Sequence, residues 1–451
     1  MLNFTRPYFW LLAYLVIMFL RPQEYVDVLI ETPVVPASLM VAASVWLLAQ
    51  EKRFKAPQHG LMLGLTATMG LSVLSSGWAT GAVNVVTKFV PTLLVFYMVA
   101  TSVDSIKKFK EICLILSAMS FIMAIHGMEQ IANEEGKGWT GAATIQGRIT
   151  YLGLLNDPND LAMVFLMSLP LTLYLTRHAE SFVMRQSCYL AAAATVYGIY
   201  LCNSRGSILG LVAMLTLYVG RRFGMLQSSV VLPVLIGLLA IFAPSRSGDL
   251  SASESSAAGR VDAWYAGFEM FFDHPFFGVG AGLFTDHHQL TAHNSFVLAM
   301  AEMGLAGYTC WFAILAVSAA MLWRLLTVAE PARQSTDPPD EFAEVADQLL
   351  QEEDAKLLDP APTWLDIQDA AAALSYAYIG VVVTAFFLSR SYVVFLYLMV
   401  ALVVAVYQLA VRHWPALVPV QLNSMLGPLL TMVFVSIGGL WLLTSVLLRI
   451  S

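Results

Sequence analysis

Two arginines and one histidine stand where they could act on a phosphorylated substrate. Arg205 lies in a short polar break between two apolar runs, and Arg260 and His293 lie in one long polar segment, residues 244–303. A guanidinium stays charged and its planar fork matches two phosphate oxygens, whereas a neutral imidazole can accept a proton. These residue types could therefore bind a phosphate or diphosphate group and supply a general base.

The sequence around His293 predicts how its side chain is held. Asn294, Ser295 and an apolar run follow it, so we expect His293 at the first turn of a helix, where free backbone amides favour the neutral imidazole. The alternative is a histidine that only caps or packs against the helix. Upstream, an amphipathic helix is expected from Arg260, with Trp264 on its apolar face.

A glycine-rich turn and several histidines connect these two expected helices. The turn, Gly278 to Gly282, follows no strand, so we interpret it as close backbone packing rather than as a nucleotide fingerprint. A metal site is the other possibility for this region, but the spacing of its histidines and acids matches no standard ligand set. We therefore expect no metal and no other cofactor. The residues considered for such a site are His274, Asp286, His287, His288 and His293.

The composition indicates that membrane helices must position these residues. Of the 451 residues, 58% are hydrophobic and only 12% are charged, and the mean hydropathy is +0.70. An ordinary soluble domain carries about twice this charged fraction. These values exclude a soluble globular protein, and the ordinary totals of Gly, Pro and Cys exclude a collagen-like, disordered or disulfide-stabilised chain. An all-α polytopic membrane protein remains.

Thirteen apolar runs are candidates for membrane-spanning helices, because a crossing needs roughly 17 to 25 residues. We expect twelve or thirteen spans, the first short and retained as an anchor because no cleavage site of small residues follows it. The four cysteines lie in or beside these runs and are expected to be packing thiols. The runs are residues 8–20, 32–49, 60–76, 81–100, 111–131, 158–176, 187–203, 206–219, 228–243, 304–327, 371–389, 393–410 and 426–448.

Basic residues between the runs predict which helix ends face the cytoplasm. Clusters such as Lys52 to Lys55, Lys107 to Lys110 and Arg221 to Arg222 recur on one side, which the positive-inside rule places in the cytoplasm together with the N terminus. The opposite side then receives the loops at residues 132–157, 203–206, 244–303 and 389–392.

Nine of the 24 basic residues oppose this rule. Arg148, Arg205 and Arg390 lie in loops or at the ends of runs on the opposite side, and Lys88 lies within a run. An unpaired charge is costly at the membrane edge, so a group of such residues indicates a shared anionic ligand. For any single arginine, the alternative is that it reaches the lipid headgroups or pairs with a nearby acid.

The net charge of −7 comes from one segment. Residues 329–370 hold twelve acids and two bases, so they carry −10, and the remaining 19 acids and 22 bases give +3. We interpret the segment as a cytoplasmic insertion, either a solvated loop or a short amphipathic helix, rather than a docking site. The predicted organisation is transmembrane helices in residues 1–243, a loop that carries the site in 244–303, one helix in 304–327, the acidic insertion in 328–370 and further transmembrane helices in 371–451.

Four stretches carry motifs in a fixed order and spacing. They are Arg148 with Asn156 to Ala162, Asn203 to Gly206, Arg260 with Trp264 and Pro275 to Phe284, and His293-Asn294 followed after nine residues by Gly304 and after two more by Gly307. Together they cover about residues 145–310 and resemble the bacterial O-antigen ligases and the related lipid-linked glycan polymerases. The last stretch is similar to the signature His-[Asn/Ser/Gln]-x9-Gly-x-x-Gly of these enzymes.

The resemblance implies a helical enzyme of the GT-C type with a large periplasmic loop, in the bacterial inner membrane. Such an enzyme is a metal-independent, inverting glycosyltransferase. It takes a glycan from an undecaprenyl diphosphate-linked donor on the periplasmic face and passes it to lipid A-core or a similar acceptor. Its expected partners are therefore this donor, the acceptor and membrane lipids, and not a nucleic acid.

The resemblance also assigns roles to residues. His293 is expected to accept the proton of the acceptor hydroxyl, and Arg205 and Arg260 are expected to stabilise the leaving diphosphate. From local spacing alone, Asp160 is expected to cap the helix that follows it, and the alternative is that it binds hydroxyl groups of the acceptor sugar. Glu302 is expected to support packing rather than touch His293. The expected substrate-binding residues are Arg148, Asn159, Asp157, Asn294, Lys88 and Arg390.

Three other functions fit part of the sequence. Trp264 stands where family ligases carry leucine, so a polymerase that joins lipid-linked O-antigen or exopolysaccharide units is the first alternative. A flippase for such glycans would place charges near the bilayer midplane and show repeated halves, and only Lys88 fits this pattern. A structural subunit that acts through the acidic insertion would need neither Arg260 nor His293.

Overall fold

The computed structural model describes residues 6–49, 52, 54–224, 226–227, 229–230, 233, 250–331 and 361–449. In the helix that begins at residue 250, side chains are described from residue 259 onward. Apart from two isolated bridges, Lys137 with Ala143 and Ile145 with Arg148, the regular structure in these ranges is helical. The predicted all-α class is confirmed.

Long helices alternate with connections that are mostly short. In the described ranges, single turns of 3-10 helix occur in the connections before α2 and α6, at η1 (Pro22–Glu24), η2 (Asp27–Leu29) and η3 (Gly153–Leu155). The α-helices are α1 (Pro7–Leu20), α2 (Val34–Leu48), α3 (Pro57–Ser75), α4 (Ala79–Ser102), α5 (Ile106–Ala132), α6 (Pro158–Arg177), α7 (Phe182–Cys202), α8 (Arg205–Phe223), α10 (Leu250–Asp273), α11 (Phe284–His287), α12 (Ser295–Thr327), α14 (Trp364–Phe386), α15 (Val394–His413) and α16 (Leu422–Leu447).

Eight of the described helices are long and apolar enough to cross a membrane, namely α4, α5, α6, α8, α12, α14, α15 and α16. This is fewer than the twelve or thirteen spans expected. α1 and α2 have only 14 and 15 residues, and α3 and α7 are less apolar. The expected span at residues 228–243 lies almost wholly outside the described residues. The chain is an all-α polytopic membrane protein.

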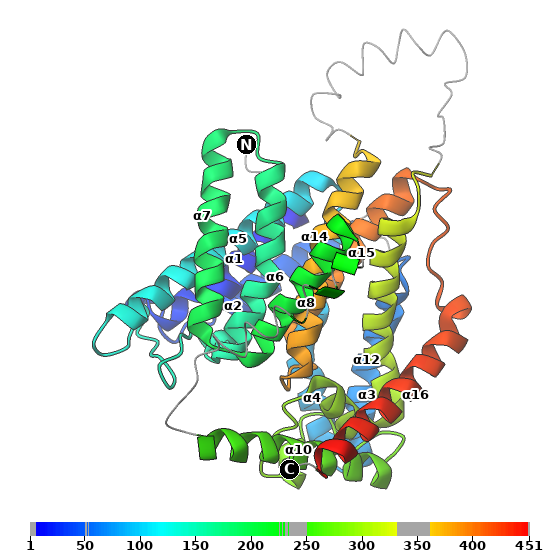
Figure 1. Ribbon diagram of the computed structural model, residues 1–451. Helices are drawn as coiled ribbons and strands as arrows, with labels where there is room; N and C mark the ends of the chain where they lie inside the picture. Colours follow the sequence, from blue (N-terminus) through cyan, green and yellow to red (C-terminus); the bar gives the residue numbers. More distant parts are fainter. Residues whose placement is uncertain are drawn as a thin grey trace.

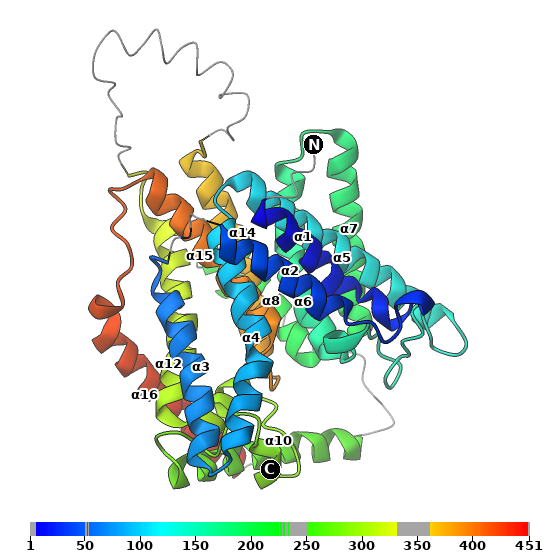
Figure 2. The ribbon, with the colours of Figure 1, turned by 180° about the vertical axis from the view of Figure 1, so that it is seen from behind.

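Two groups of helices flank a central pair, α14 and α15 (Figures 1 and 2). α1, α5, α6 and α7 lie on one side, and α3, α12 and α16 lie on the other. α14 packs against α6 and α8, whereas α15 packs against α4 and α12. α15 is apolar all round and buried along nearly its whole length, so it forms the centre of the core. The four cysteines are free, and three of them are buried in this helical body, as expected for packing thiols.

α10 lies across one end of the bundle rather than along it (Figure 1). Its apolar side chains Trp264 and Phe268 are buried, and the ring of Phe268 packs edge-on against Trp441 of α16. The charged side chain of Asp262 is exposed on the other face. The predicted amphipathic helix from Arg260 is therefore confirmed. It is part of a longer helix that begins at Leu250 and ends at Asp273.

α12 breaks at Gly304, the first glycine of the motif that begins at His293. Gly304 has φ 60° and ψ −163°, a backbone region that only glycine adopts readily. The break leaves the amides of Leu305 and Ala306 without partners in their own helix. They donate instead to the carbonyls of Pro275 and Phe276, at 2.8 and 3.1 Å.

The predicted glycine turn packs against α12 just before this break. The amides of Val279 and Gly280 donate to the carbonyls of Ala301 and Glu302, at 3.0 and 2.9 Å. A Cβ added to Gly278 would lie 2.4 Å from the carbonyl carbon of Glu302, so the two backbones approach too closely for any other residue. The interpretation of this turn as close backbone packing is confirmed.

Most of the predicted acidic insertion, residues 332–360, lies outside the described residues, as does the helical stretch expected within it. The described part begins again at residue 361, and α14 starts at Trp364. Thr363 and Asp366 form a capping box at this end, in which each side chain accepts from the backbone of the other residue. One of the twelve acids in the segment therefore has a structural role.

Candidate functional site

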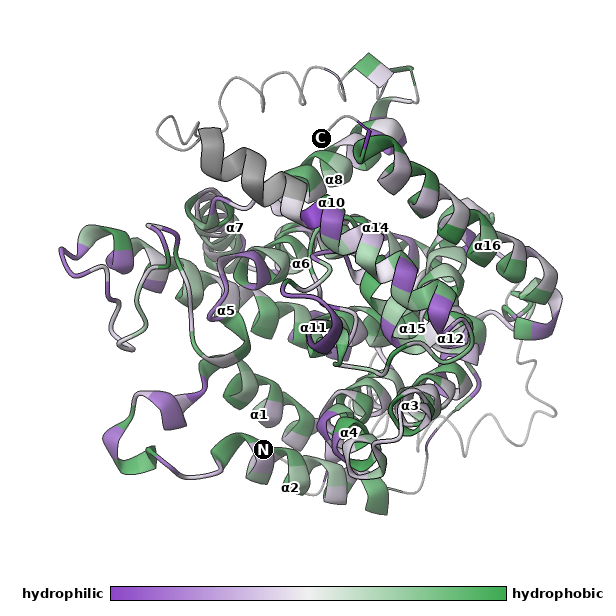
Figure 3. Cartoon of the chain, turned by 90° about the horizontal axis from the view of Figure 1, so that it is seen from below, coloured by the Kyte–Doolittle hydropathy of each residue, from purple (hydrophilic) through white to green (hydrophobic). Residues whose placement is uncertain are grey.

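The end of the bundle covered by α10 collects most of the residues that the sequence singles out. Figure 3 looks onto this end, where hydrophilic residues gather in the connections around α11 and along α10. Here α6, α8 and α12 all begin, capped by the side chains of Asp157, Ser204 and Asn294. The positive ends of three helix dipoles therefore point toward the same region, which favours an anion there.

Arg148 ties the loop before α6 to the end of α7. Its Nε donates to the carbonyl of Cys202 at 2.7 Å, and one Nη donates to Oδ1 of Asn159 at 2.7 Å. Asn159 in turn donates through its backbone and side-chain nitrogens to Oδ1 of Asp157, at 2.7 and 2.9 Å. Three of the expected substrate-binding residues thus form one hydrogen-bonded group.

Arg390 comes from the connection between α14 and α15 and pairs with Asp160 of α6. Its Nε donates to Oδ1 of Asp160 at 2.5 Å, and this carboxylate is almost completely buried. Burial alone would lower the pKa of Arg390, but the carboxylates of Asp160 and Asp157 together raise it above its ordinary value. The expectation that Asp160 caps α6 was wrong, because Asp157 holds the cap position and Asp160 faces the arginine instead.

Arg205 and Arg260 lie close enough for their charges to interact. Arg205 is the exposed first residue of α8, and Arg260 is half-buried on α10. Burial and the positive charge of Arg205 lower the pKa of Arg260 below its ordinary value. Within the described part of the chain, neither guanidinium has a hydrogen bond or an ion pair. Two like charges left without a counterion indicate a place for an anionic ligand.

His293 sits directly before the cap of α12 in a left-handed conformation, with φ 47°. Its backbone amide donates to Oγ of Ser389 at 2.7 Å, and the hydroxyl of Thr291 donates to the same oxygen at 2.8 Å. Its half-buried imidazole hydrogen-bonds none of the residues that the structure describes. The side chain is therefore oriented through its backbone.

The charges around His293 favour its neutral form. Burial lowers the pKa of the imidazole, and the positive charges of Arg260 and Arg390 lower it further, while Asp157 acts in the opposite direction. The predicted direction of this shift is confirmed. Burial is its largest cause, and guanidiniums from α10 and the α14–α15 connection add to the positive field that was expected from the free amides of α12.

The connection between α14 and α15 contains, beside the expected Arg390, two site residues that the sequence did not single out, Ser389 and Ser391. Besides the contact of Ser389 with His293, the amide of Arg390 donates to Oγ of Ser295 at 2.9 Å, and Oγ of Ser391 donates to the carbonyl of Ser295 at 2.7 Å. These residues are more than 90 positions apart, and serine pairs of this kind leave no signal in a single sequence. We call residues 389–391 the serine clasp.

Three further residues complete the description of this end. Asn294 is fully buried, its Oδ1 accepts from the amides of Phe296 and Val297, and its Nδ2 has no partner among the described residues. Glu302 is buried and accepts from the amide of Phe284 at 3.1 Å and from the hydroxyl of Tyr392 at 2.7 Å, so it supports packing. The structure does not connect Lys88 to this group: its side chain is exposed on α4 and no described contact joins it to the others.

The residues considered for a metal site are used differently. His288 pairs with Asp262 at 3.1 Å, and its Nδ1 lies 2.9 Å from the carbonyl oxygen of Leu290. The ranges that the structure describes contain no group of three or more His, Cys, Asp or Glu side chains suited to holding a metal ion. Metal independence of the chemistry stays a prediction.

This arrangement can bind an anion and move a proton. Arg205 and Arg260 offer two guanidiniums to a phosphate or diphosphate, and His293 offers a neutral imidazole nearby. The hydrogen-bonded group of Arg148, Asp157 and Asn159 lines the same end and carries donors and acceptors suited to hydroxyl groups.

Two parts of the chain match known protein families. Residues 190–312 match the family described as O-Antigen ligase, and residues 1–180 match a family of unknown function (DUF5935). No curated protein matches the chain. The ligase match extends from α7 into α12 and includes Arg205, Arg260 and His293. Residues 190–312 are therefore similar to the O-antigen ligase-related superfamily.

Proposed function

We propose that this chain is a glycosyltransferase that moves a glycan from a polyprenyl diphosphate-linked donor to a hydroxyl acceptor. The observation that carries the proposal is that Arg205, Arg260 and His293 lie at the same end of the bundle, with Arg260 close enough to interact electrostatically with both other residues. Two guanidiniums without a described partner lie within electrostatic reach of each other, and one of them helps to keep a neighbouring imidazole neutral. The match of residues 190–312 to O-antigen ligases supports a role in glycan transfer.

In the proposed reaction, the acceptor oxygen attacks the anomeric carbon from the face opposite the diphosphate, so the configuration inverts. The bond between that carbon and the diphosphate oxygen breaks, and the diphosphate leaves with the electron pair. Arg205 and Arg260 stabilise the charge that grows on the leaving group more than they stabilise the bound substrate. His293 takes the proton of the acceptor hydroxyl. Because the arginines supply the positive charge, we propose that no metal is needed.

Residues around these three are proposed to bind the substrates. Arg148 would contact the donor diphosphate, and Asp157 and Asn159 would contact hydroxyl groups of the acceptor sugar. Nδ2 of Asn294 is a buried donor without a described partner, which supports a contact with the glycan. Arg390 would add positive charge beside His293, and Lys88 on α4 would contact the lipid-linked donor.

We propose undecaprenyl diphosphate as the lipid carrier and the periplasmic face of the bacterial inner membrane as the place of reaction, with the N terminus in the cytoplasm. A ligase would use lipid A-core or a similar acceptor, and a polymerase would use a second lipid-linked repeat unit. Trp264 favours the polymerase alternative, because ligases of the family carry leucine at this spacing. The indole of Trp264 donates a hydrogen bond to the carbonyl of Ala292 at 2.8 Å, and Ala292 is the residue directly before His293, the proposed base.

Purified full-length protein with a synthetic undecaprenyl diphosphate glycan would test the proposal. Lipid A-core is added to one reaction, and only the lipid-linked repeat unit is present in the other. Glycan on lipid A-core indicates a ligase, and longer lipid-linked chains in the second reaction indicate a polymerase. Donor that crosses liposome membranes without forming any product would favour the flippase instead.

Alanine variants in the same assay would test the proposed roles of Arg260 and His293. We expect Arg260→Ala and His293→Ala each to reduce the rate by roughly 100- to 1000-fold, because each removes a group used in the transition state. Lys137→Ala is the matched control, since Lys137 is an exposed base that pairs with Glu135 at 3.0 Å. Full activity in Arg260→Ala and His293→Ala would sink the mechanism, and loss of activity in EDTA would sink its metal-free part.

A further inference from the structure

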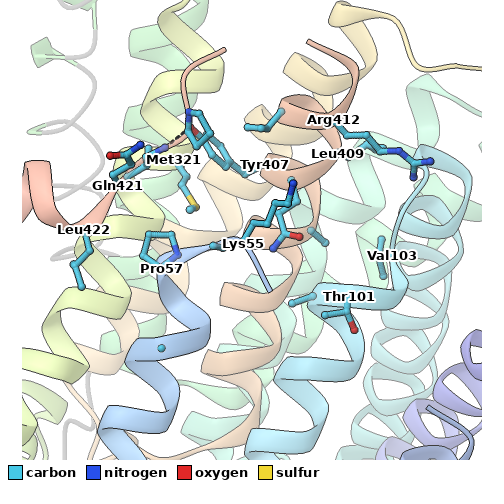
Figure 4. A pocket seen from close by; sticks show the side chains of 18 of the residues that line it. Lys55, Pro57, Thr101, Val103, Met321, Tyr407, Leu409, Arg412, Gln421 and Leu422 are labelled. Atoms are coloured by element: carbon cyan, nitrogen blue, oxygen red, sulfur yellow. Dashed lines mark hydrogen bonds between the residues drawn. The ribbon is translucent and has the colours of Figure 1, made fainter. Parts of the chain in front are cut away.

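A large cavity lies at the opposite end of the bundle from the candidate site. It has a volume of about 690 Å³ and is lined by the start of α3, the ends of α4 and α15 and the start of α16. Figure 4 shows Lys55 and Tyr407 between these helices, with Arg412 at one edge. The length of α15 separates the cavity from the candidate site. Arg390 of the site lies just before this helix, and Arg412 of the cavity lies near its end. The 20 residues of α15 span about 30 Å.

The mouth of this cavity is positively charged. Lys55 and Arg412 both line it, both are exposed, and neither has an ion pair or hydrogen bond in the described ranges. Asp104 also lines the cavity, but Lys108 neutralises its carboxylate at 2.7 Å. A second cavity of about 370 Å³ contributes Arg324 and shares with the first the wall formed by residues 419–421.

The interior of the larger cavity is mostly apolar, with one unused donor. Its walls include Ala56, Val103, Met321 and Leu422. Nε2 of Gln408 is buried in this lining and has no partner among the described residues. A buried amide without a partner is costly in a folded protein, so it marks a place where a ligand oxygen would fit.

The surroundings of the cavity determine how a ligand reaches it. α4, α12, α15 and α16 are each long and apolar enough to cross a membrane. The cavity lies where α4 and α15 end and α16 begins. The ends of membrane-spanning helices lie near the lipid headgroups. An amphiphile in the bilayer can therefore enter sideways and keep its acyl chains among apolar side chains.

We propose that this cavity binds an anionic phospholipid, with the phosphate at Lys55 and Arg412 and the first part of an acyl chain against the apolar wall. Gln408 would donate to an ester or phosphate oxygen. The apolar lining disfavours a free phosphate ion. A zwitterionic lipid is disfavoured because the acid of the lining, Asp104, is already paired and leaves nothing to match a headgroup cation. The volume suits a headgroup with part of a chain. This site is independent of the proposed glycan transfer.

Lipid titrations followed by native mass spectrometry of the full-length protein would test the charged half of the site. We expect phosphatidylglycerol to bind more tightly than phosphatidylcholine, and Lys55→Ala/Arg412→Ala to weaken phosphatidylglycerol about 10- to 30-fold. The control is Arg177→Ala/Arg185→Ala, which removes two exposed bases outside the cavity. Equal binding of the two lipids by the wild type, or an undiminished affinity in the cavity variant, would overturn the proposal.

A second pair of variants tests the apolar half. Gly60 lines the cavity, and a Cβ there meets no atom within 4 Å, so we expect the side chain in Gly60→Leu to occupy part of the cavity. Gly439→Leu makes the same change at an open position of α16. We expect only Gly60→Leu to reduce phosphatidylglycerol binding, by about tenfold. The lipid assignment is wrong if Gly60→Leu binds like the wild type, or if millimolar inorganic phosphate displaces the lipid.

Discussion

Burial and side chains from three other elements set the protonation state of His293. Arg260 on α10 and Arg390 before α15 disfavour the imidazolium, and Asp157 at the start of α6 favours it, with burial as the largest influence. Together, these influences lower the pKa of the His293 imidazole from its ordinary value of 6.5, so the neutral form is favoured at pH 7. A neutral imidazole is the form that a general base requires, and the same arginines that would hold a diphosphate also maintain it.

The pH dependence of transfer should report this histidine. Because the base acts only when neutral, we expect kcat/KM to be level near pH 7 and to fall as the pH decreases through an apparent pKa below 6.5. Asp157→Asn removes the carboxylate that raises this pKa, and asparagine also caps helices well, so the acid limb should move to still lower pH. An acid limb above pH 7, or one that stays in place in Asp157→Asn, would contradict this account.

The serine clasp holds two elements of the site together. Ser389 accepts from the amide of His293, while Ser391 and the amide of Arg390 bind Ser295 in the first turn of α12. Arg390 extends from the clasp to Asp160 of α6. The starts of α12 and α6 are therefore fixed by a connection of a few residues, and an error in this connection would displace both the proposed base and a neighbouring charge.

Removing one hydroxyl from the clasp should weaken positioning without removing a reacting group. We expect Ser389→Ala to lower kcat by roughly 10- to 100-fold with little change in the KM for the donor, because His293 loses the acceptor that orients its backbone. Ser389→Thr keeps the hydroxyl and should recover most of the activity. Ser424→Ala, at an exposed serine of α16, is the control. A loss in Ser389→Ala that threonine does not restore would indicate a packing defect instead.

The break in α12 depends on one glycine. Gly304 lies in a region that is closed to other residues, and a Cβ there would also meet the backbone of Phe276 at 2.5 Å. We expect Gly304→Ala to lower the free energy of unfolding by about 2–3 kcal/mol or more, measured by thermal unfolding in detergent. Gly438→Ala, inside α16 with open space around it, should be neutral or stabilise by up to about 1 kcal/mol. Equal stability of the two variants would argue against the structural role of the break.

Two charged regions lie at opposite ends of the long helices: the candidate site, and the cavity that Lys55 and Arg412 line. The candidate site lies where α12 begins, and the residues around Arg324 and the cavity lie where α12 ends. Residues 305–327, which follow the break at Gly304, span about 35 Å. The described residues on either side of the acidic segment, 329–331 after α12 and 361–363 before α14, belong to this second end.

Removing the acidic segment should leave the proposed chemistry intact. We expect replacement of residues 332–360 by a short glycine-serine linker to change the rate of transfer in vitro by less than about twofold. The replacement ends before Thr363, because Thr363 caps α14 and its loss would destabilise that helix. A rate that falls tenfold while the thermal stability of the protein is unchanged would show that the segment takes part in the reaction.

Local sequence by itself determined the class of the protein and several ends of its elements. The apolar runs fixed an all-α membrane fold, the Ser204-Arg205 break fixed the start of α8, and Asn294 fixed the start of α12. The motif around His293 also pointed to the superfamily that residues 190–312 then matched. Helix formation, capping and glycine turns depend on neighbours within a few residues, so one sequence carries their signal.

Only the tertiary structure decided which side chains face each other. The pairing of Arg390 with Asp160 spans 230 positions, and the contact of Ser389 with His293 spans 96. Asp160 looked like a cap when only its neighbours were considered, and the cavity beside Lys55 had no signal at all. Partner choice over such separations follows from how α6, α12, α14 and α15 pack, and a guanidinium or hydroxyl can satisfy many partners equally well until packing selects one.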